Sequence, residues 1–195
     1  MLAIFLSYLL LYKYTVLFAV IFLASLLLPL PAAALLMAAG AFSVQGYFDM
    51  RTVLAVGLSA SVAGDGAGYL LSLFYGEDIL SRIGFKKILK SSKFSELRSD
   101  FIKNSALTIF LSRFLFTHLG SSVNILSGIS KIPKKKFFFY DFGGEIIYAL
   151  LYGGLGYFFG GRWQSLTGIL SDFTVILALA VLLVVIYKYS KNKKT

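Results

Sequence analysis

Long, unbroken apolar stretches, rather than alternating apolar and polar positions, dominate the pattern of this chain. A helix that crosses the roughly 30 Å hydrocarbon core of a bilayer needs about 20 mostly apolar residues. The four main stretches are Tyr14–Leu28, Thr52–Tyr75, Phe137–Phe159 and Phe173–Tyr187. The pattern therefore predicts an all-α membrane protein with about four transmembrane helices.

Two other apolar segments are predicted to enter the membrane and turn back. Ala32–Val44 follows Pro29 and Pro31, which cannot continue a helix, and it is too short to cross. Ser105–Ser130 is long enough, but basic clusters flank both ends, so a crossing would place one cluster outside, against the positive-inside bias. Thr117–Ser122 offers a turn for the reversal. These re-entrant elements would enter from opposite faces, an inverted-repeat-like arrangement typical of transporters with a site near the midplane.

The remaining segments are predicted to lie at or outside the membrane surface. Residues 1–13 lack a basic start and a small-residue cleavage site, so we expect a retained interfacial helix. Gln45–Arg51 is expected to be a polar turn and Gly160–Asp172 an outer loop. Glu77–Asn104 mixes charges of both signs with apolar residues, which predicts one amphipathic surface helix. Residues 188–195 form a basic tail.

The amino-acid composition indicates a protein that is embedded in a lipid bilayer. Of 195 residues, 58% are hydrophobic and 14% are charged, more apolar surface than a soluble domain of this size can bury. The 19 Phe and 12 Tyr suit bilayer packing and interfacial belts. We expect one membrane domain over residues 1–195.

The net charge of +10 is explained by topology. Of the 19 Lys and Arg, seven lie in Arg82–Lys103, four in Lys131–Lys136 and four in Lys188–Lys194. Basic clusters beside apolar segments mark cytoplasmic loops that contact anionic lipid head groups. We therefore expect a cytoplasmic C-terminus and membrane lipids as partners, and we expect the location to be a bacterial inner membrane. We expect no nucleic-acid partner, because the sequence contains no polar domain that could offer a binding surface. The sequence leaves open whether the protein forms a homo-oligomer.

Cysteine and histidine counts exclude several chemistries. With 0 Cys and 1 His, the chain cannot form disulfides or build the usual zinc, copper or iron sites. We expect no metal centre and no cofactor.

Ionisable residues inside apolar segments are candidates for function, because burying them is unfavourable. Asp65, Arg113, His118 and Glu145 are the candidates for substrate or proton binding. Alternative interpretations are a structural ion pair between Asp65 and Arg113, and a hydrogen bond from His118 to a turn carbonyl. Asp141, five residues past Lys136, is expected to lie at the interface in contact with solvent.

Prolines and small residues supply the candidate structural positions. Pro29 and Pro31 end a helix, Gly64 and Gly68 allow close helix approach, and Gly120 lies in the predicted turn. Small-residue spacing of this kind indicates packing and identifies no function by itself.

Three stretches resemble the DedA family, which shares the VTT or SNARE-associated domain. They are LPLPAAALLMAAGAFSVQG at Leu28–Gly46, GDGAGYLLSLFYG at Gly64–Gly76, and Ser112–Gly160, which begins SRFLFTHLGSSVN. Together they define a DedA-like core over residues 28–160. The resemblance implies two oppositely inserted re-entrant elements and movement of lipids, such as undecaprenyl phosphate or phospholipids, across the bilayer, in some members driven by proton motive force.

Some of the functional residues of the DedA family match residues of this sequence, and others do not. Asp65 matches the intramembrane acid of the family and Arg113 its first arginine. Ala32 or Ala33 replaces the usual acid after the second proline, Phe116 the usual proline, and Leu119 the second arginine. We therefore advance the hypothesis that Glu145 takes over part of the missing acid's role in proton coupling.

Three functions remain open on the sequence. A flippase-like or scramblase-like transporter of lipids or lipid phosphates is favoured, with Arg113 as a phosphate contact. A membrane scaffold without transport is the alternative. A lipid phosphatase is disfavoured, because Ser112-Arg113 and His118 resemble its signature but a second catalytic histidine is lacking. We expect that the protein is not an enzyme.

Overall fold

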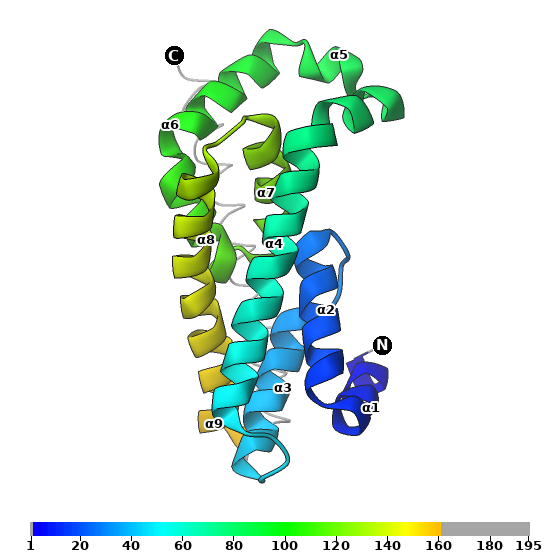
Figure 1. Ribbon diagram of the computed structural model, residues 1–195, viewed down its shortest axis with the longest axis vertical. Coiled ribbons are helices and arrows are strands. Elements are labelled where there is room, and N and C mark those ends of the chain that lie inside the picture. Colours follow the sequence, from blue (N-terminus) through cyan, green and yellow to red (C-terminus); the bar gives the residue numbers. More distant parts are fainter. Residues whose placement is uncertain (1, 161–195) are drawn as a thin grey trace, which may run out of the picture. The chain divides into compact units, whose positions relative to one another are not determined.

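The computed structural model describes residues 2–160, and every regular element in that range is a helix (Figure 1). The elements are α1 Leu2–Tyr12, α2 Tyr14–Leu26, α3 Ala32–Val44, α4 Met50–Leu80, η1 Ser81–Phe85, α5 Lys86–Leu89, α6 Ser92–Phe114, η2 Thr117–Leu119, α7 Gly120–Ile129, α8 Lys134–Tyr148, η3 Ala149–Gly153 and α9 Gly154–Phe158. The predicted all-α class is confirmed for this part of the chain. The outer loop, the helix over 173–187 and the basic tail lie outside the described residues.

Helix α4 is the long central element of the described unit. Its 31 residues extend about 46 Å at 1.5 Å per residue, enough to cross a bilayer. Asp49 caps its first turn, where its Oδ1 accepts a hydrogen bond of 2.8 Å from the backbone N–H of Thr52. The polar turn and the helix predicted over Thr52–Tyr75 are both confirmed, and the helix continues to Leu80.

Helices α2 and α3 form a first hairpin beside α4. Each has 13 residues, about 20 Å, so neither is long enough to cross a bilayer alone. Pro29 and Pro31 lie in the connection, where they end α2 and precede α3 as predicted. Figure 1 shows the two helices running in opposite directions. The segment Tyr14–Leu28 is thus the first arm of a hairpin, shorter than the full span that the apolar pattern predicts.

Helices α6 and α7 form a second hairpin. The chain reverses over residues 115–119, which overlap the first half of the predicted turn Thr117–Ser122, with η2 in the bend. Helix α7 packs against α4 and α6 packs against α8. In Figure 1 the two hairpins lie along α4 from its opposite ends, so their tips approach the same middle level.

The segment Glu77–Asn104 is not the single amphipathic helix that the sequence predicts. Helix α4 runs into the turn η1, where Gly84 adopts φ 99°, a left-handed conformation that breaks the helix and suits glycine. Ser91 then caps α6, its hydroxyl accepting a hydrogen bond from the N–H of Phe94. The prediction failed because one glycine and one cap outweigh the amphipathic pattern.

The basic clusters 82–103 and 131–136 lie at the same end of the described unit. Arg98 forms an ion pair of 3.4 Å with Glu77 and donates a hydrogen bond to the carbonyl of Ile129. Lys134 lies over the ring of Phe74, 5.4 Å from its centre. The end of α4, the start of α6 and the start of α8 therefore meet, as expected if both clusters face one side of a membrane.

Glycines allow α3 to lie against the end of the α8–η3–α9 run. A Cβ at Gly156 would overlap the backbone carbonyl of Met37, and one at Gly40 would overlap that of Gly153. The backbones therefore touch at both places, which requires glycine.

This contact predicts an effect on stability. Gly156→Ala should lower the free energy of unfolding in detergent by about 1–3 kcal/mol, because the new methyl group overpacks a rigid backbone contact. Gly154→Ala, where a Cβ would meet no atom within 4 Å, should leave stability unchanged or slightly higher. Thermal unfolding of the two variants measures the difference, and equal midpoints would contradict the packing described.

Candidate functional site

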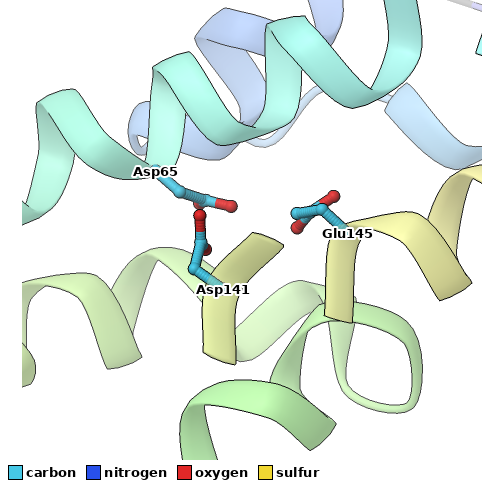
Figure 2. A group of neighbouring side chains, drawn as sticks. All are labelled: Asp65, Asp141 and Glu145. Atoms are coloured by element: carbon cyan, nitrogen blue, oxygen red, sulfur yellow. The ribbon is translucent and has the colours of Figure 1, made fainter. Parts of the chain in front are cut away.

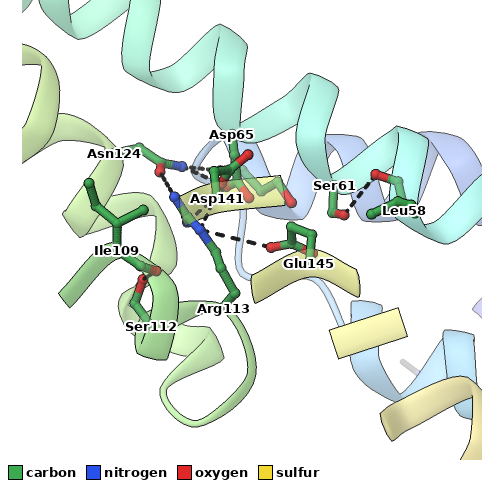
Figure 3. A network of polar contacts seen from close by, with 10 residues as sticks. Leu58, Ser61, Asp65, Ile109, Ser112, Arg113, Asn124, Asp141 and Glu145 are labelled. Carbon is green, nitrogen blue, oxygen red and sulfur yellow. Dashed lines mark hydrogen bonds and ion pairs between the residues drawn. The ribbon is translucent and has the colours of Figure 1, made fainter. Parts of the chain in front are cut away.

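A buried arginine lies where the second hairpin reverses. Arg113 is in the last turn of α6 and is 3% exposed. Its Nε lies 2.8 Å from Asp141 Oδ1, its Nη1 3.3 Å from Asp65 Oδ1, and its Nε 4.0 Å from Glu145 Oε1 (Figure 3). Helix α4 supplies Asp65 and helix α8 supplies the other two acids. One guanidinium thus binds together three helices.

The three carboxylates are close neighbours. One oxygen from each of Asp65, Asp141 and Glu145 lies within 4.8 Å of the others, and all three residues are buried. Figure 2 shows the carboxyl groups of Asp65 and Asp141 turned toward each other with Glu145 alongside. Three ionised carboxylates against one guanidinium would leave two negative charges without compensation. Such an excess of charge is unfavourable in a buried site.

Asn124 connects this cluster to the tip of the first hairpin. Its Oδ1 accepts a hydrogen bond of 2.8 Å from Arg113 Nη2. Its Nδ2 donates to Asp65 Oδ1 at 2.6 Å and to the carbonyl of Ser25 at 3.3 Å. Ser25 lies in the last turn of α2, whose final carbonyls have no partner within the helix. The two hairpin tips therefore meet through one amide side chain.

Aromatic rings close one side of the site. Phe137 stacks on Tyr69 with ring centres 4.1 Å apart, and Arg113 Cζ lies 5.6 Å from the centre of the Phe137 ring. The Tyr69 hydroxyl donates a hydrogen bond of 2.6 Å to the carbonyl of Ile132. The Gly-Asp-Gly-Ala-Gly-Tyr stretch thus provides both an acid of the cluster and the support of its arginine.

Small residues make the close approach possible. A Cβ at Gly144 would lie 2.7 Å from Arg113 Cγ, and one at Gly64 would lie 2.5 Å from the carbonyl oxygen of Phe22. Gly144 therefore admits the arginine and Gly64 brings α4 against α2, as predicted. At Gly68 and Gly120 the nearest atoms would be 3.5 and 3.4 Å away, so those contacts are looser.

Several polar atoms of the cluster lack directed hydrogen bonds. Arg113 Nε and Nη1, both oxygens of Asp141 and Glu145 Oε2 are buried without a hydrogen-bond partner. The short Nε to Asp141 distance is thus an ion-pair contact in which the N–H does not point at the oxygen. Charge attraction holds the cluster together while donors and acceptors remain available.

Most of the predicted site residues come together in the structure. Asp65, Arg113 and Glu145 lie in one cluster, and the ion pair between Asp65 and Arg113 that the sequence left as an alternative is present. The solvent-exposed position expected for Asp141 is wrong, since that residue is 0% exposed. Asp141 shares a helix face with Glu145, four residues on, and this face turns inward. Asn124, an amide within an apolar stretch, was missed, although its unusual position was a usable signal.

Other candidates stay outside the cluster. The side chain of His118 lies outside the described part of the structure. Ser112 is buried and its hydroxyl donates a hydrogen bond of 2.8 Å to the Ile109 carbonyl.

The acid cluster is the group of described residues with the spacing of a cation site. An oxygen-only set suits hard cations such as Ca²⁺ or Mg²⁺. Here Arg113, 2.8 Å from Asp141, already provides positive charge, and a divalent ion would have to lie beside it. The charge of Arg113 therefore makes this set a poorer metal site than its spacing alone indicates.

Comparison with known proteins agrees with this architecture. The model of the VTT domain matches residues 30–158. An uncharacterised membrane protein of Synechocystis, slr0232, is 28% identical over 149 residues, covering 76% of this chain and 68% of the relative. Protein DedA of Escherichia coli is 28% identical over 152 residues, covering 75% and 68%. The inner membrane protein YghB of E. coli is 26% identical over 147 residues, covering 74% and 66%. No solved structure matches the chain at a significant level.

The family match covers α3, the long helix α4, the second hairpin and the arginine and three acids of the buried cluster, while α2 lies before it. Two of these relatives, slr0232 and YghB, are described as membrane proteins, in agreement with the apolar composition and with α4. The chain therefore belongs to the VTT-domain family of membrane proteins that includes DedA.

Proposed function

We propose that this protein moves lipids with phosphate-bearing head groups across the membrane, and that protons bound by the acid cluster are linked to the movement. One observation carries the proposal: the tips of two hairpins from opposite ends of α4 meet at a buried arginine with surplus acid around it.

In this proposal the hairpins are re-entrant elements. Helix α4 and the α8–η3–α9 run cross the membrane, while α2–α3 enters from the outer face and α6–α7 from the cytoplasmic face. The basic clusters 82–103 and 131–136 share one end, which the positive-inside bias assigns to the cytoplasm. Reversals at bilayer depth are tolerated where protein or a polar cavity covers them, and here each tip covers the other.

Arg113 is the proposed phosphate contact. A guanidinium forms paired, charge-assisted hydrogen bonds with phosphate oxygens. Two of its nitrogens lack directed hydrogen bonds in this state, so it has donors to offer. A phosphate that reaches Arg113 would compete with Asp65 and Asp141 for the same charge.

The surplus acids are the proposed proton carriers. Glu145 lies 4.0 Å from Arg113, further than Asp141 at 2.8 Å, so it is the least neutralised of the close pairs. This supports the hypothesis that Glu145 replaces part of the acid missing after Pro31.

A membrane scaffold without transport remains the second candidate. It is favoured by the exposed apolar and basic surface over 77–104, which includes Ile79, Ile88 and Leu97. If the protein were such a scaffold, the buried cluster would serve only to hold the helices together.

The proposed topology predicts where single cysteines react. Because the chain has 0 Cys, Lys103→Cys and Lys134→Cys can each be labelled alone with a membrane-impermeant maleimide. Both should react from the cytoplasmic side, and Tyr47→Cys, which is at an exposed position in the opposite turn, from the outer side. Reaction of Lys103→Cys and Lys134→Cys from different sides would refute re-entry of α6–α7.

Transport should depend on the buried cluster. In liposomes, the purified protein should accelerate the exchange of fluorescent phospholipid or of a polyprenyl phosphate between leaflets. Arg113→Ala and Asp65→Asn should lower the rate about tenfold or more, because hydrogen bonds to charged groups contribute about 1.5–3 kcal/mol.

Folding must be controlled, since removing one member of a buried pair destabilises. Arg113→Lys keeps the charge but loses the planar fork, and Asp100→Asn removes an acid from an exposed pair. We expect a reduced rate for the first and the wild-type rate for the second, with monodisperse protein in both. Equal lipid movement with and without protein would refute transport and leave the scaffold.

Glu145→Gln tests the link to protons. The variant should fold as stably as the wild type, because the lost charge is loosely paired, while an imposed pH gradient should no longer change its transport rate. Asp141→Asn, which removes the closest partner of Arg113, should instead lower thermal stability. An unaltered response of Glu145→Gln to the gradient would refute the hypothesis.

A further inference from the structure

An apolar groove lies at the surface of the described unit, mainly on α6 and α8. It encloses about 830 Å³, within the ~300–1,000 Å³ typical of small-molecule sites. Residues from three helices line it, including Val62, Leu107, Phe110, Phe139, Phe142 and Gly143. The groove is separate from the polar cluster but shares a wall with it: Phe110 lies beside the groove, and its carbonyl and Arg113 both approach Gly144.

One end of the groove is basic. Lys103 precedes Ala106, Leu107 and Phe110 on the same stripe of α6, at helical spacings of three, four and seven residues. Lys136 stands in the same relation to the groove residues Phe139, Tyr140 and Gly143 on α8.

Both lysines lie toward the same end of the groove. Helices α6 and α8 pack together, and Gly143 lies beside Phe110. The positions seven residues earlier, Lys103 and Lys136, are then displaced in the same direction, about 10 Å along the helices. Lys103 is exposed and its pair with Asp100, at 3.5 Å, is exposed too, so the pair is weak and leaves the ammonium available.

We propose that this groove binds the hydrocarbon chain of an anionic lipid, with its phosphate between Lys103 and Lys136. The inference rests on the proposed function, because the groove would hold the lipid before its head group reaches Arg113. Phe110 and Gly144 separate the groove from that arginine. Charge complementarity selects the occupant: an apolar slot closed by two ammonium groups matches a molecule with a long apolar chain and one anionic head.

Other occupants match the groove less well. A second copy of this chain would bring another basic end to the lysines. The apolar segment 173–187 contains no acidic residue to pair with them. A zwitterionic lipid would fill the slot but would gain less from the two positive charges.

Quenching of a single tryptophan tests the inference. Leu107→Trp in a Trp163→Phe background, checked for monodisperse folding, places the only tryptophan beside the groove. Vesicles would contain either brominated phosphatidylglycerol or brominated phosphatidylcholine with the same chains. This groove tryptophan should prefer the anionic lipid about thirtyfold over the zwitterionic one, the factor expected for about 1 kcal/mol from each of the two lysines. Leu150→Trp in the same background, at an exposed position of η3 outside the groove, supplies a reference tryptophan that reports ordinary surrounding lipid.

Paired variants identify the source of the preference. Lys103→Gln with Lys136→Gln should reduce the preference at the groove tryptophan to that at the reference tryptophan, whereas Lys87→Gln with Lys90→Gln, the same loss of charge on exposed residues, should not. Gly143→Leu fills the slot, since its Cβ would meet Phe110 at an ordinary 3.5 Å, and should reduce quenching by both lipids. Gly154→Leu, built into open space, should not.

Two results would overturn the inference. Equal lipid preference at the groove and reference tryptophans would mean ordinary surrounding lipid, and no quenching of the groove tryptophan by either lipid would mean that protein covers the groove. Binding is read here without transport. Leaflet exchange with no groove preference would therefore refute the groove and keep the transporter, and the reverse result would refute the transporter and keep the groove.

Discussion

The structure depends on placing one guanidinium among three carboxylates away from water. Arg113 holds α6 to α4 through Asp65 and to α8 through Asp141, and Asn124 extends the same network to α2. A buried ion is stabilised only when opposite charges and hydrogen bonds replace the water it has lost. Because these groups come from five helices, α2, α4, α6, α7 and α8, the network can form only when both hairpin tips are in place, and it thereby specifies their mutual register.

On the proposed topology, the hairpins in turn explain how a polar centre can exist at the depth of the bilayer core. A continuous spanning helix satisfies its own backbone and offers only side chains, whereas a helix that ends mid-membrane presents free carbonyls or N–H groups. The end of α2 uses one such carbonyl, that of Ser25, as an acceptor for Asn124. Glycine at position 64 lets α4 lie against α2, and glycine at position 144 leaves room for Arg113 beside α8. The charged cluster therefore depends on small residues at the helix contacts around it.

The sequence predicted where the chain turns better than it predicted which way its side chains face. Pro29 and Pro31 act locally, and flanking lysines act on topology, so both reversals could be located from residues near them. The direction of Asp141 depends on how α8 is rotated against α6, which Gly144 decides through contact with a residue 31 positions earlier. The role of Asn124 was missed for the same reason, because its contacts with Arg113 and Asp65 depend on how α7 is rotated against α6 and α4. The break at Gly84 was missed for a different reason: an amphipathic pattern says which face is apolar, but not whether the helix is continuous.

On the proposed function, carboxylates and the lipid phosphate compete for Arg113, and this competition would couple proton binding to phosphate binding. A phosphate that pairs with the guanidinium must displace a carboxylate, and a displaced, buried carboxylate is tolerated only when it is protonated. Proton uptake and phosphate binding would therefore favour each other, and by linkage each would strengthen the other by the same factor. When the phosphate leaves, the carboxylates return to Arg113 and the protons are released. The coupling requires no large domain motion, only an acid surplus around a single arginine, and that surplus is present in the positions of Asp65, Asp141 and Glu145.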